Sequence, residues 1–301
     1  MPQTISGTTG YTVASTGGIS APVAQFATEF IKGYERGESM LRKTVSTKTQ
    51  KQGSSHVFLI TDSGAATAQT RGLDGNLIGR SMNQNQVTLT MTEWHDLPRK
   101  TGFNIFSSQY QGREDMYQTA YEVINRKVEN QILDALATAT TGPTATASSN
   151  AIKLLTDGVT IMSGNNVPVD DGEVYACVSH GFIQACLESD VFSNADYVSM
   201  MKWDDGVHSQ KMMYKWNGIN IFTNTGIPGH ATSSETCFLY HKSAIGHAID
   251  SESFNVTAGY NDENDYSWVR ASAFSGAKLL QNGGVQKLKF VGNAATSVSV
   301  S

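Results

Sequence analysis

The chain has 301 residues, of which 39% are hydrophobic and 16% are charged, and its formal net charge at pH 7 is −5. This composition excludes a disordered chain, and the lack of a basic excess argues against a dedicated nucleic-acid-binding domain. The three cysteines are too few and too scattered for a disulfide framework or a zinc knuckle. The first residues lack the basic head and apolar core of a signal peptide, and no run approaches the ~18 apolar residues of a membrane span. We therefore expect a protein that is made in the cytoplasm.

Charge is distributed unevenly along the chain. Residues 1–113 have a net charge of +4, and the remaining residues have a net charge of −9. A front half and a back half of opposite sign are typical of a subunit whose front half lies against the back half of a neighbouring copy.

The N-terminal region begins with about twenty residues that are rich in Gly, Ser and Thr and show no periodicity. They predict an N-terminal arm that becomes ordered only when it contacts another part of the structure. Pro22–Leu41 predicts a short amphipathic helix, because proline suits the first turn and Phe26, Phe30 and Ile31 share one face.

A long polar excursion then separates two strand-like segments, His56–Thr61 and Val87–Trp94. It consists of some twenty mostly polar residues, with glycines at intervals. An irregular connection of this length is uncommon inside a compact domain and usually has a function. Phe103–Ser108 predicts a further short strand.

The strongest helical pattern of the chain lies in Arg113–Thr140. Its apolar residues recur at every fourth position and predict a core-facing stripe. At ~1.5 Å per residue the helix would be roughly 40 Å long, which is more than a small core needs. The stripe consists of Met116, Ala120, Ile124, Val128, Ile132 and Leu136.

An α/β pattern follows a small linker. It predicts a helix in Ala151–Pro168 that ends at Gly164, a buried strand in Glu173–Ser179, and a helix in His180–Asp190 that is capped by Ser179.

The remaining residues predict strands with short connections. Met212–Asn224 predicts a β-hairpin in which Trp216 precedes Asn217-Gly218, the dipeptide that favours a type I′ turn. Cys237–Asp250 predicts a strand and a short helix, and the residues after Ser253 predict antiparallel strands in the segments FNVTAGY, YSWVRASAF, AKLLQ and VQKLKFV.

No catalytic, cofactor or metal motif is present in the sequence. It has no Walker loop, GxGxxG, HExxH, GxSxG or CxxC. We interpret His180, His241 and His247 as structural, and the NDEND segment at 261–265 as a solvated turn because it lacks the calcium-loop spacing. We expect no enzyme, no cofactor and no metal site.

The order of these elements resembles that of the major capsid proteins of tailed bacteriophages, with the short podovirus-type proteins most similar. TEWHDLPRKTGFNIFSSQ and YEVINRKVENQILDAL look like the junction between a strand and the spine helix of that family. YKWNGINIFTNTGIPG looks like its hairpin with a Gly-x-Pro turn, and FLYHKSAIGHAID looks like the segment after it. The resemblance covers nearly the whole chain.

The resemblance implies an α+β capsid fold. Its parts would be an N-terminal arm in 1–50, an extended E-loop hairpin in 51–100, a peripheral P-domain in 101–150 and 236–301 with a spine helix in 113–140, and an axial A-domain in 151–235. The E-loop residues expected to contact a neighbouring subunit are Arg71, Leu73, Asp74, Leu77, Ile78 and Arg80.

The resemblance also implies a structural protein that assembles into the pentamers and hexamers of an icosahedral head around double-stranded DNA, in the virion after assembly in the host cytoplasm. The partners would be a separate scaffolding protein, a portal, in some phages decoration proteins, and DNA held without sequence specificity. A separate scaffold is expected because the arm, short helix and E-loop account for the residues before the spine helix. Some members join an E-loop lysine to an asparagine of a neighbour, but this chain has no lysine between Lys51 and Lys100.

Two alternatives stay open at this point. Encapsulin nanocompartments share the fold, and a cargo peptide in place of packaged DNA would identify one. A monomeric α+β hydrolase would need a nucleophile in a concave site, which the sequence does not offer, and it would elute near 32.5 kDa.

Overall fold

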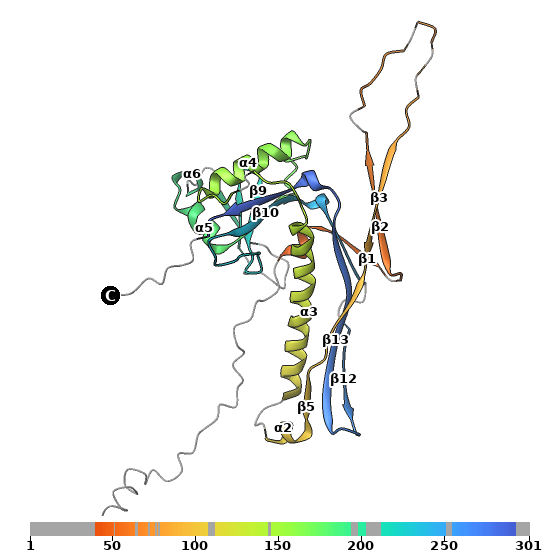
Figure 1. Ribbon diagram of the computed structural model, residues 1–301, viewed down its shortest axis with the longest axis vertical. Helices are drawn as coiled ribbons and strands as arrows, with labels where there is room; N and C mark the ends of the chain where they lie inside the picture. Colours follow the sequence, from red (N-terminus) through yellow and green to blue (C-terminus); the bar gives the residue numbers. More distant parts are fainter. Residues whose placement is uncertain are drawn as a thin grey trace, which may run out of the picture.

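The computed structural model describes residues 40–50, 52–63, 66–71, 73–75, 77, 79–107, 112–143, 146–193, 198–202, 212–250 and 255–292. The expected helix in Pro22–Leu41 therefore lies outside the described residues, apart from its last two positions. Three sheets, one long helix and several short helices make up the described part (Figure 1).

The first sheet lies beside the long helix. Its strands are ordered β1-β11-β13-β12, and β4 and β5 pair with β13. All pairs are antiparallel except β1 with β11. The bounds are β1 Ser46–Gln50, β4 Thr92–Asp96, β5 Arg99–Thr101, β11 Ile245–Asp250, β12 Asn255–Asn261 and β13 Tyr266–Leu279.

The second sheet forms the centre of the α/β part, in the order β14-β10-β6-β9-β8-β7. Strand β6 is buried along its whole length and pairs in parallel with β9 and antiparallel with β10. The bounds are β6 Val174–Val178, β7 Val198–Lys202, β8 Met212–Trp216, β9 Ile219–Thr223, β10 Glu235–His241 and β14 Val285–Phe290.

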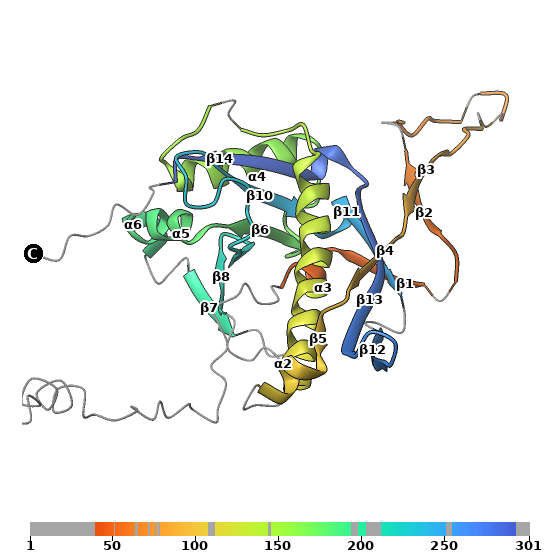
Figure 2. The same cartoon turned by 60° about the horizontal axis from the view of Figure 1, so that its bottom comes forward.

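The third sheet is a two-stranded ribbon of β2 (Ser55–Asp62) and β3 (Asn83–Thr90). It projects away from both other sheets and carries the polar excursion at its end (Figures 1 and 2).

The helices and 3-10 turns connect these sheets. Helix α3 runs along β13, while α4, α5 and α6 belong to the α/β part (Figure 1). The bounds are η1 Leu41–Lys43, α2 Gly102–Ser107, α3 Gly112–Ala137, α4 Ala151–Gly164, α5 His180–Leu187, α6 Asp190–Ser193, η2 Lys242–Ala244 and η3 Asn282–Gly284.

Local sequence signals explain several of these boundaries. Helix α4 ends at Gly164 as the sequence predicts, and its N-cap is Asn150, whose side chain accepts a hydrogen bond from the N–H of Lys153 at 3.0 Å. The N-cap of helix α5 is Ser179, as the sequence predicts, and its hydroxyl oxygen accepts from the N–H of Phe182 at 3.1 Å. Both satisfy N–H groups that the first helical turn leaves without helical partners.

Three sequence predictions need correction. Phe103–Ser108 is not a strand, because residues 102–107 form helix α2. Val87–Trp94 is not one strand, because Met91 separates β3 from β4 and its N–H donates to the carbonyl of Ser54. The segments YSWVRASAF and AKLLQ belong to the single strand β13, which ends at Leu279. Short apolar runs are ambiguous by periodicity alone, and long-range pairing decides between the alternatives.

Helix α3 joins two separate hydrophobic clusters. Its N-terminal residues, including Met116 and Val128, pack with β13, whereas Ile132 and Leu136 pack in the core of the α/β part. The buried polar side chain of Glu129 lies between Val128 and Ile132, where the helix passes from one cluster to the other, and that of Asn125 lies beside the first cluster. All six residues of the predicted apolar stripe are buried, but they pack in two hydrophobic cores instead of one.

Candidate inter-subunit surfaces

The root of the polar excursion, the candidate E-loop, is fixed by packing on one face of the ribbon. Phe58 and Leu89 form a small cluster with Ala248 of β11. Gly246 makes the close approach possible, because a Cβ at this position would lie 2.8 Å from the Phe58 ring. The E-loop therefore leaves the body of the subunit at a defined place.

The other face of the ribbon and its end are exposed. Val57 and Leu59 point away from the cluster, and Leu59 is 67% exposed. Leu73, Leu77 and Met82 are also exposed at the tip of the E-loop, which we define as residues 66–82. Large apolar side chains that gather in solvent mark interaction surfaces more often than single exposed residues do.

Polar contacts shape the tip locally. The guanidinium of Arg71 donates to the carbonyl of Gly75 at 2.9 Å, and that of Arg80 donates to the carbonyl of Ser63 at 2.6 Å. Gly75 has a φ of 75°, which suits glycine in this turn. Asp74 is exposed beside these residues. Of the expected contact residues, Ile78 lies outside the described residues.

A second exposed apolar surface was missed by the sequence analysis. Phe103 and Phe106 of α2 are 73% and 87% exposed. The N–H of Gly102 donates to the carbonyl of Asp265 at 3.1 Å, so the turn between β12 and β13 abuts α2. We call α2 and residues 262–265 the foot. Two phenylalanines three positions apart, a helical spacing, were the signal that could have revealed it.

The hairpin of the α/β part is formed by β8 and β9. Asn217 and Gly218 have φ values of 47° and 78°, as a type I′ turn requires, and both are exposed. Trp216 is buried, and its ring centroid lies 5.7 Å from that of Phe192. Trp216 thus anchors the hairpin, while the turn is available on the surface.

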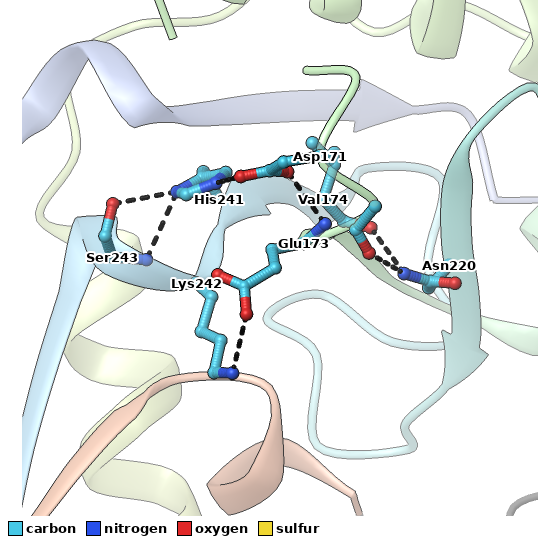
Figure 3. Close-up of polar contacts among 8 residues, drawn as sticks. Asp171, Glu173, Val174, Asn220, His241, Lys242 and Ser243 are labelled. Carbon is cyan, nitrogen blue, oxygen red and sulfur yellow. Dashed lines mark hydrogen bonds and ion pairs between the residues drawn. The ribbon is translucent and has the colours of Figure 1, made fainter. Parts of the chain in front are cut away.

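A polar cluster lies where β6 begins and β10 ends, in the middle of the second sheet (Figure 3). His241 Nε2 lies 2.8 Å from Asp171 Oδ2, and Lys242 Nζ donates to Glu173 Oε1 at 2.9 Å. Burial raises the pKa of Asp171, but the hydrogen bond with His241 and further hydrogen bonds outweigh it and lower that pKa. The hydrogen bond with Glu173 raises the pKa of Lys242.

The same cluster is the one group of three potential metal ligands within the described ranges. Ligand atoms of Asp171, Glu173 and His241 lie within 4.8 Å of one another. However, His241 and Glu173 are already engaged with Asp171 and Lys242. The cluster therefore holds the loop at residues 171–173 against the end of β10 as it stands.

The three cysteines are inaccessible. Cys177, Cys186 and Cys237 are buried, and burial raises the pKa of Cys186 and of Cys237 to about 12. Thiols of such a pKa are not nucleophilic at neutral pH. No helix in the part of the chain that the structure describes is long and apolar enough to cross a membrane.

Solved structures with a similar fold come from phages and related particles. The capsid of the cyanophage P-SCSP1u matches with a TM-score of 0.69 at 13% identity, over 91% of this chain and 94% of that chain. A structure from Mycobacterium phage Che8 matches with a TM-score of 0.67 at 15% identity, over 87% and 95%. The capsid of the native GTA particle matches with a TM-score of 0.66 at 12% identity, over 92% and 98%.

These likenesses show that the fold is that of tailed-phage major capsid proteins, and no finding favours an encapsulin. A search among curated proteins finds no match. A sequence model of the family described as phage capsid protein matches residues 19–291. This match covers most of the chain, and the chain therefore belongs to the phage capsid protein family and is a structural protein of a capsid.

Proposed function

We propose that this protein is the major subunit of an icosahedral phage head, in which its copies form pentamers and hexamers around double-stranded DNA. The E-loop is the observation that carries the proposal. It is a long excursion whose described residues pack on the body of the subunit at its root, and it presents Leu59, Leu73 and Leu77 to solvent. A monomeric enzyme has no second copy on which to bury this excursion, whereas a shell subunit can bury it on a neighbouring subunit.

The energetics favour assembly over isolated subunits. Burying one leucine side chain contributes roughly 1.5–3 kcal/mol, so one E-loop contributes a modest amount after the cost of ordering it. Every subunit repeats the same contact, and a closed shell gains stability from the number of its contacts. We infer that contacts through Arg71, Leu73, Asp74, Leu77, Ile78 and Arg80 act in this way.

We assign the parts of the subunit in the same terms. Residues 1–50 form the arm, 51–100 the E-loop, 101–150 and 236–301 the P-domain, and 151–235 the A-domain. Strands β10 and β14 pair within the second sheet, so they are the strands through which the P-domain joins the A-domain. The exposed turn at Asn217 and Gly218 belongs to the A-domain.

The assembly would require further partners. We propose a separate scaffolding protein, a portal through which the DNA enters, and decoration proteins where the mature head needs reinforcement. The DNA would be held without sequence specificity, and the protein would act in the host cytoplasm before it is part of the virion. We propose no catalytic role.

Electron microscopy and sedimentation of the purified protein test the proposal, with a scaffolding protein co-expressed if needed. We expect pentamers, hexamers and closed shells. A variant in which residues 64–81 are replaced by a short turn keeps the ribbon root and should fold but not form shells. A full-length protein that stays a monomer near 32.5 kDa under all these conditions would contradict the proposal.

A matched charge experiment addresses the E-loop directly. Reversal of Arg71 and Arg80 to Glu should lower shell yield, and more so at low salt, where surface charges act most strongly. Reversal of Lys153 and Lys287 to Glu is the control, because these lysines lie on α4 and β14, away from the E-loop. An equal effect of both pairs would speak against a specific role of the E-loop.

A further inference from the structure

The chain has two Asn-Gly dipeptides, at residues 217–218 and 282–283. An asparagine before a glycine has a reactivity of its own, because the next backbone nitrogen can attack the side-chain amide. Glycine has no Cβ that would hinder this attack, and its backbone turns easily toward the amide. The structure places the two dipeptides in different surroundings, and this difference decides which of them can react.

The first dipeptide is open to solvent and unrestrained. Asn217 and Gly218 form the turn between β8 and β9, and both are exposed. No hydrogen bond joins the side-chain amide of Asn217 or the N–H of Gly218 to a residue that the structure describes. A Cβ on Gly218 would meet no described atom within 4 Å, so the space around the dipeptide is free. The backbone nitrogen can therefore approach the amide without breaking a contact.

The second dipeptide is also exposed, but hydrogen bonds hold its amide. Asn282 lies in η3, and its side-chain oxygen accepts from the N–H of Thr140 at 2.9 Å. Its side-chain nitrogen donates to the hydroxyl oxygen of Thr140 at 2.9 Å. Its backbone carbonyl accepts from the hydroxyl of Thr141 at 3.1 Å. Attack on this amide requires the loss of both side-chain hydrogen bonds, so the same dipeptide is protected here.

We propose that Asn217 is a site of spontaneous deamidation in the folded protein, with water as the co-reactant, and that Asn282 is protected from it. The backbone nitrogen of Gly218 loses its proton to hydroxide and forms a bond to Cγ of Asn217. The Cγ–Nδ2 bond breaks, the leaving nitrogen takes a proton from water and departs as ammonia, and hydroxide is regenerated. Water then adds to either carbonyl of the resulting succinimide ring and gives aspartate or isoaspartate.

Both products change the turn. Aspartate keeps the main chain as it is and adds one negative charge to a subunit whose formal net charge is −5. Isoaspartate also adds a side-chain carbon to the main chain, so the two-residue connection between the paired Trp216 and Ile219 is no longer that of a type I′ turn. The inference goes beyond the proposed function and needs only the folded chain, so it does not depend on assembly.

Peptide mapping of the aged protein tests the inference. The purified protein is kept folded in mildly alkaline buffer, and samples are digested in mildly acidic buffer, where deamidation during digestion is slow. Mass spectrometry measures the fraction of each Asn-Gly peptide in which OH has replaced NH2, and fragmentation locates the change. We expect Asn217 to convert roughly tenfold faster than Asn282, because two hydrogen bonds hold the second amide.

Two controls separate the effect of the fold from that of the dipeptide. In urea the contacts of Asn282 are lost, so both dipeptides should convert at similar rates. Thr140→Ala removes the hydroxyl that accepts from the Asn282 amide, at an exposed position after α3. In this variant the folded protein should deamidate at Asn282 severalfold faster, while the rate at Asn217 should stay as it is.

The outcomes are decisive in each case. Conversion of Asn217 no faster than that of Asn282 in the folded protein would overturn the inference. If Thr140→Ala does not fold, the comparison between folded and urea-unfolded protein decides, and an equal ratio of the two rates in both states would overturn the inference. A protein that deamidates at Asn217 but never forms oligomers would support this inference and contradict the proposed function.

Discussion

The hydroxyl of Ser179 donates a hydrogen bond to the carboxylate of Glu235, and both side chains are buried. The same hydroxyl oxygen caps α5 by accepting from the N–H of Phe182. The other carboxylate oxygen accepts from the N–H of Ala231 at 2.8 Å. One buried carboxylate thus joins the start of β10 to the start of α5 and to the loop before β10.

Removal of this hydroxyl should destabilise the α/β part. Ser179→Ala deletes the helix cap and leaves one oxygen of the buried Glu235 without its donor, so we expect the free energy of unfolding to fall by about 1–3 kcal/mol. Urea unfolding followed by circular dichroism measures the change. Thr156→Ala, which removes an exposed hydroxyl on α4, is the control and should change stability by less than ~0.5 kcal/mol. Equal losses of unfolding free energy in Ser179→Ala and Thr156→Ala would show that the hydrogen bonds of Ser179 stabilise the fold no more than those of an exposed hydroxyl.

A buried histidine makes the stability of the subunit sensitive to acid. His247 of β11 is buried, and its Nδ1 lies 3.3 Å from the hydroxyl oxygen of Thr47. Burial, and to a smaller extent the charge of Arg42, lowers the pKa of His247 from 6.5 to about 4. Between these two values the unfolded chain binds more protons than the folded one, so folding stability is lost as the pH falls.

The expected loss is on the order of 3 kcal/mol between pH 7 and pH 4, because each unit of pKa difference corresponds to ~1.4 kcal/mol. His247→Gln removes the titrating group and should flatten the stability profile in this window. His95→Gln, at an exposed histidine of β4, is the matched control for replacing an imidazole by an amide. Urea unfolding at a series of pH values measures all three proteins, and identical slopes for the unmodified protein and His247→Gln would refute the assignment.

A glycine sets how closely β13 approaches the E-loop root. A Cβ on Gly276 would lie 2.6 Å from the carbonyl oxygen of Thr90 and 2.9 Å from Leu89 Cδ2. Gly276→Ala should therefore cost about 1–3 kcal/mol of unfolding free energy, since the backbone must move. Gly164→Ala, where a Cβ meets no described atom within 4 Å, should be neutral or stabilise by up to ~1 kcal/mol. Thermal unfolding measures both variants. Equal unfolding midpoints for Gly276→Ala and Gly164→Ala would contradict this account.

The sequence predicted those elements whose signals are local. Asn217-Gly218 encodes a turn through its left-handed backbone, and Ser179 encodes a helix start through its side chain. Both depend on neighbours within a few residues. The long helix was equally clear, because its stripe repeats over many turns.

The parts that were missed depend on distant partners. Phe103 and Phe106 favour a strand by residue type, yet they form a helix whose start is tied to the carbonyl of Asp265. Strand β14 pairs with β10 across 45 or more residues, and no local pattern specifies that choice. The α3 stripe is apolar throughout, so the sequence did not show that Val128 and Ile132 belong to different cores. The exposed E-loop tip could be expected from its polar, glycine-rich composition.

The chemistry of the E-loop bears on whether the shell is covalently linked. Isopeptide formation needs a lysine amine that loses its proton and attacks an amide. The cations at the tip are Arg71 and Arg80, and a guanidinium stays protonated and is a poor nucleophile. Lys100 of β5, which follows the E-loop strands, lies in an ion pair with Asp115 of α3.

We therefore expect the shell to be held by non-covalent contacts alone. Mature particles boiled in denaturing detergent should release a single band near 32.5 kDa. Particles fixed with glutaraldehyde before boiling are the control, because they show that the gel resolves linked pentamers and hexamers. A ladder from unfixed particles would mean that a lysine outside the E-loop reaches an amide of a neighbour, and mass spectrometry of the linked peptides would identify it. A single band would instead leave packing at the tip and the overlap of neighbouring subunits as the source of shell stability.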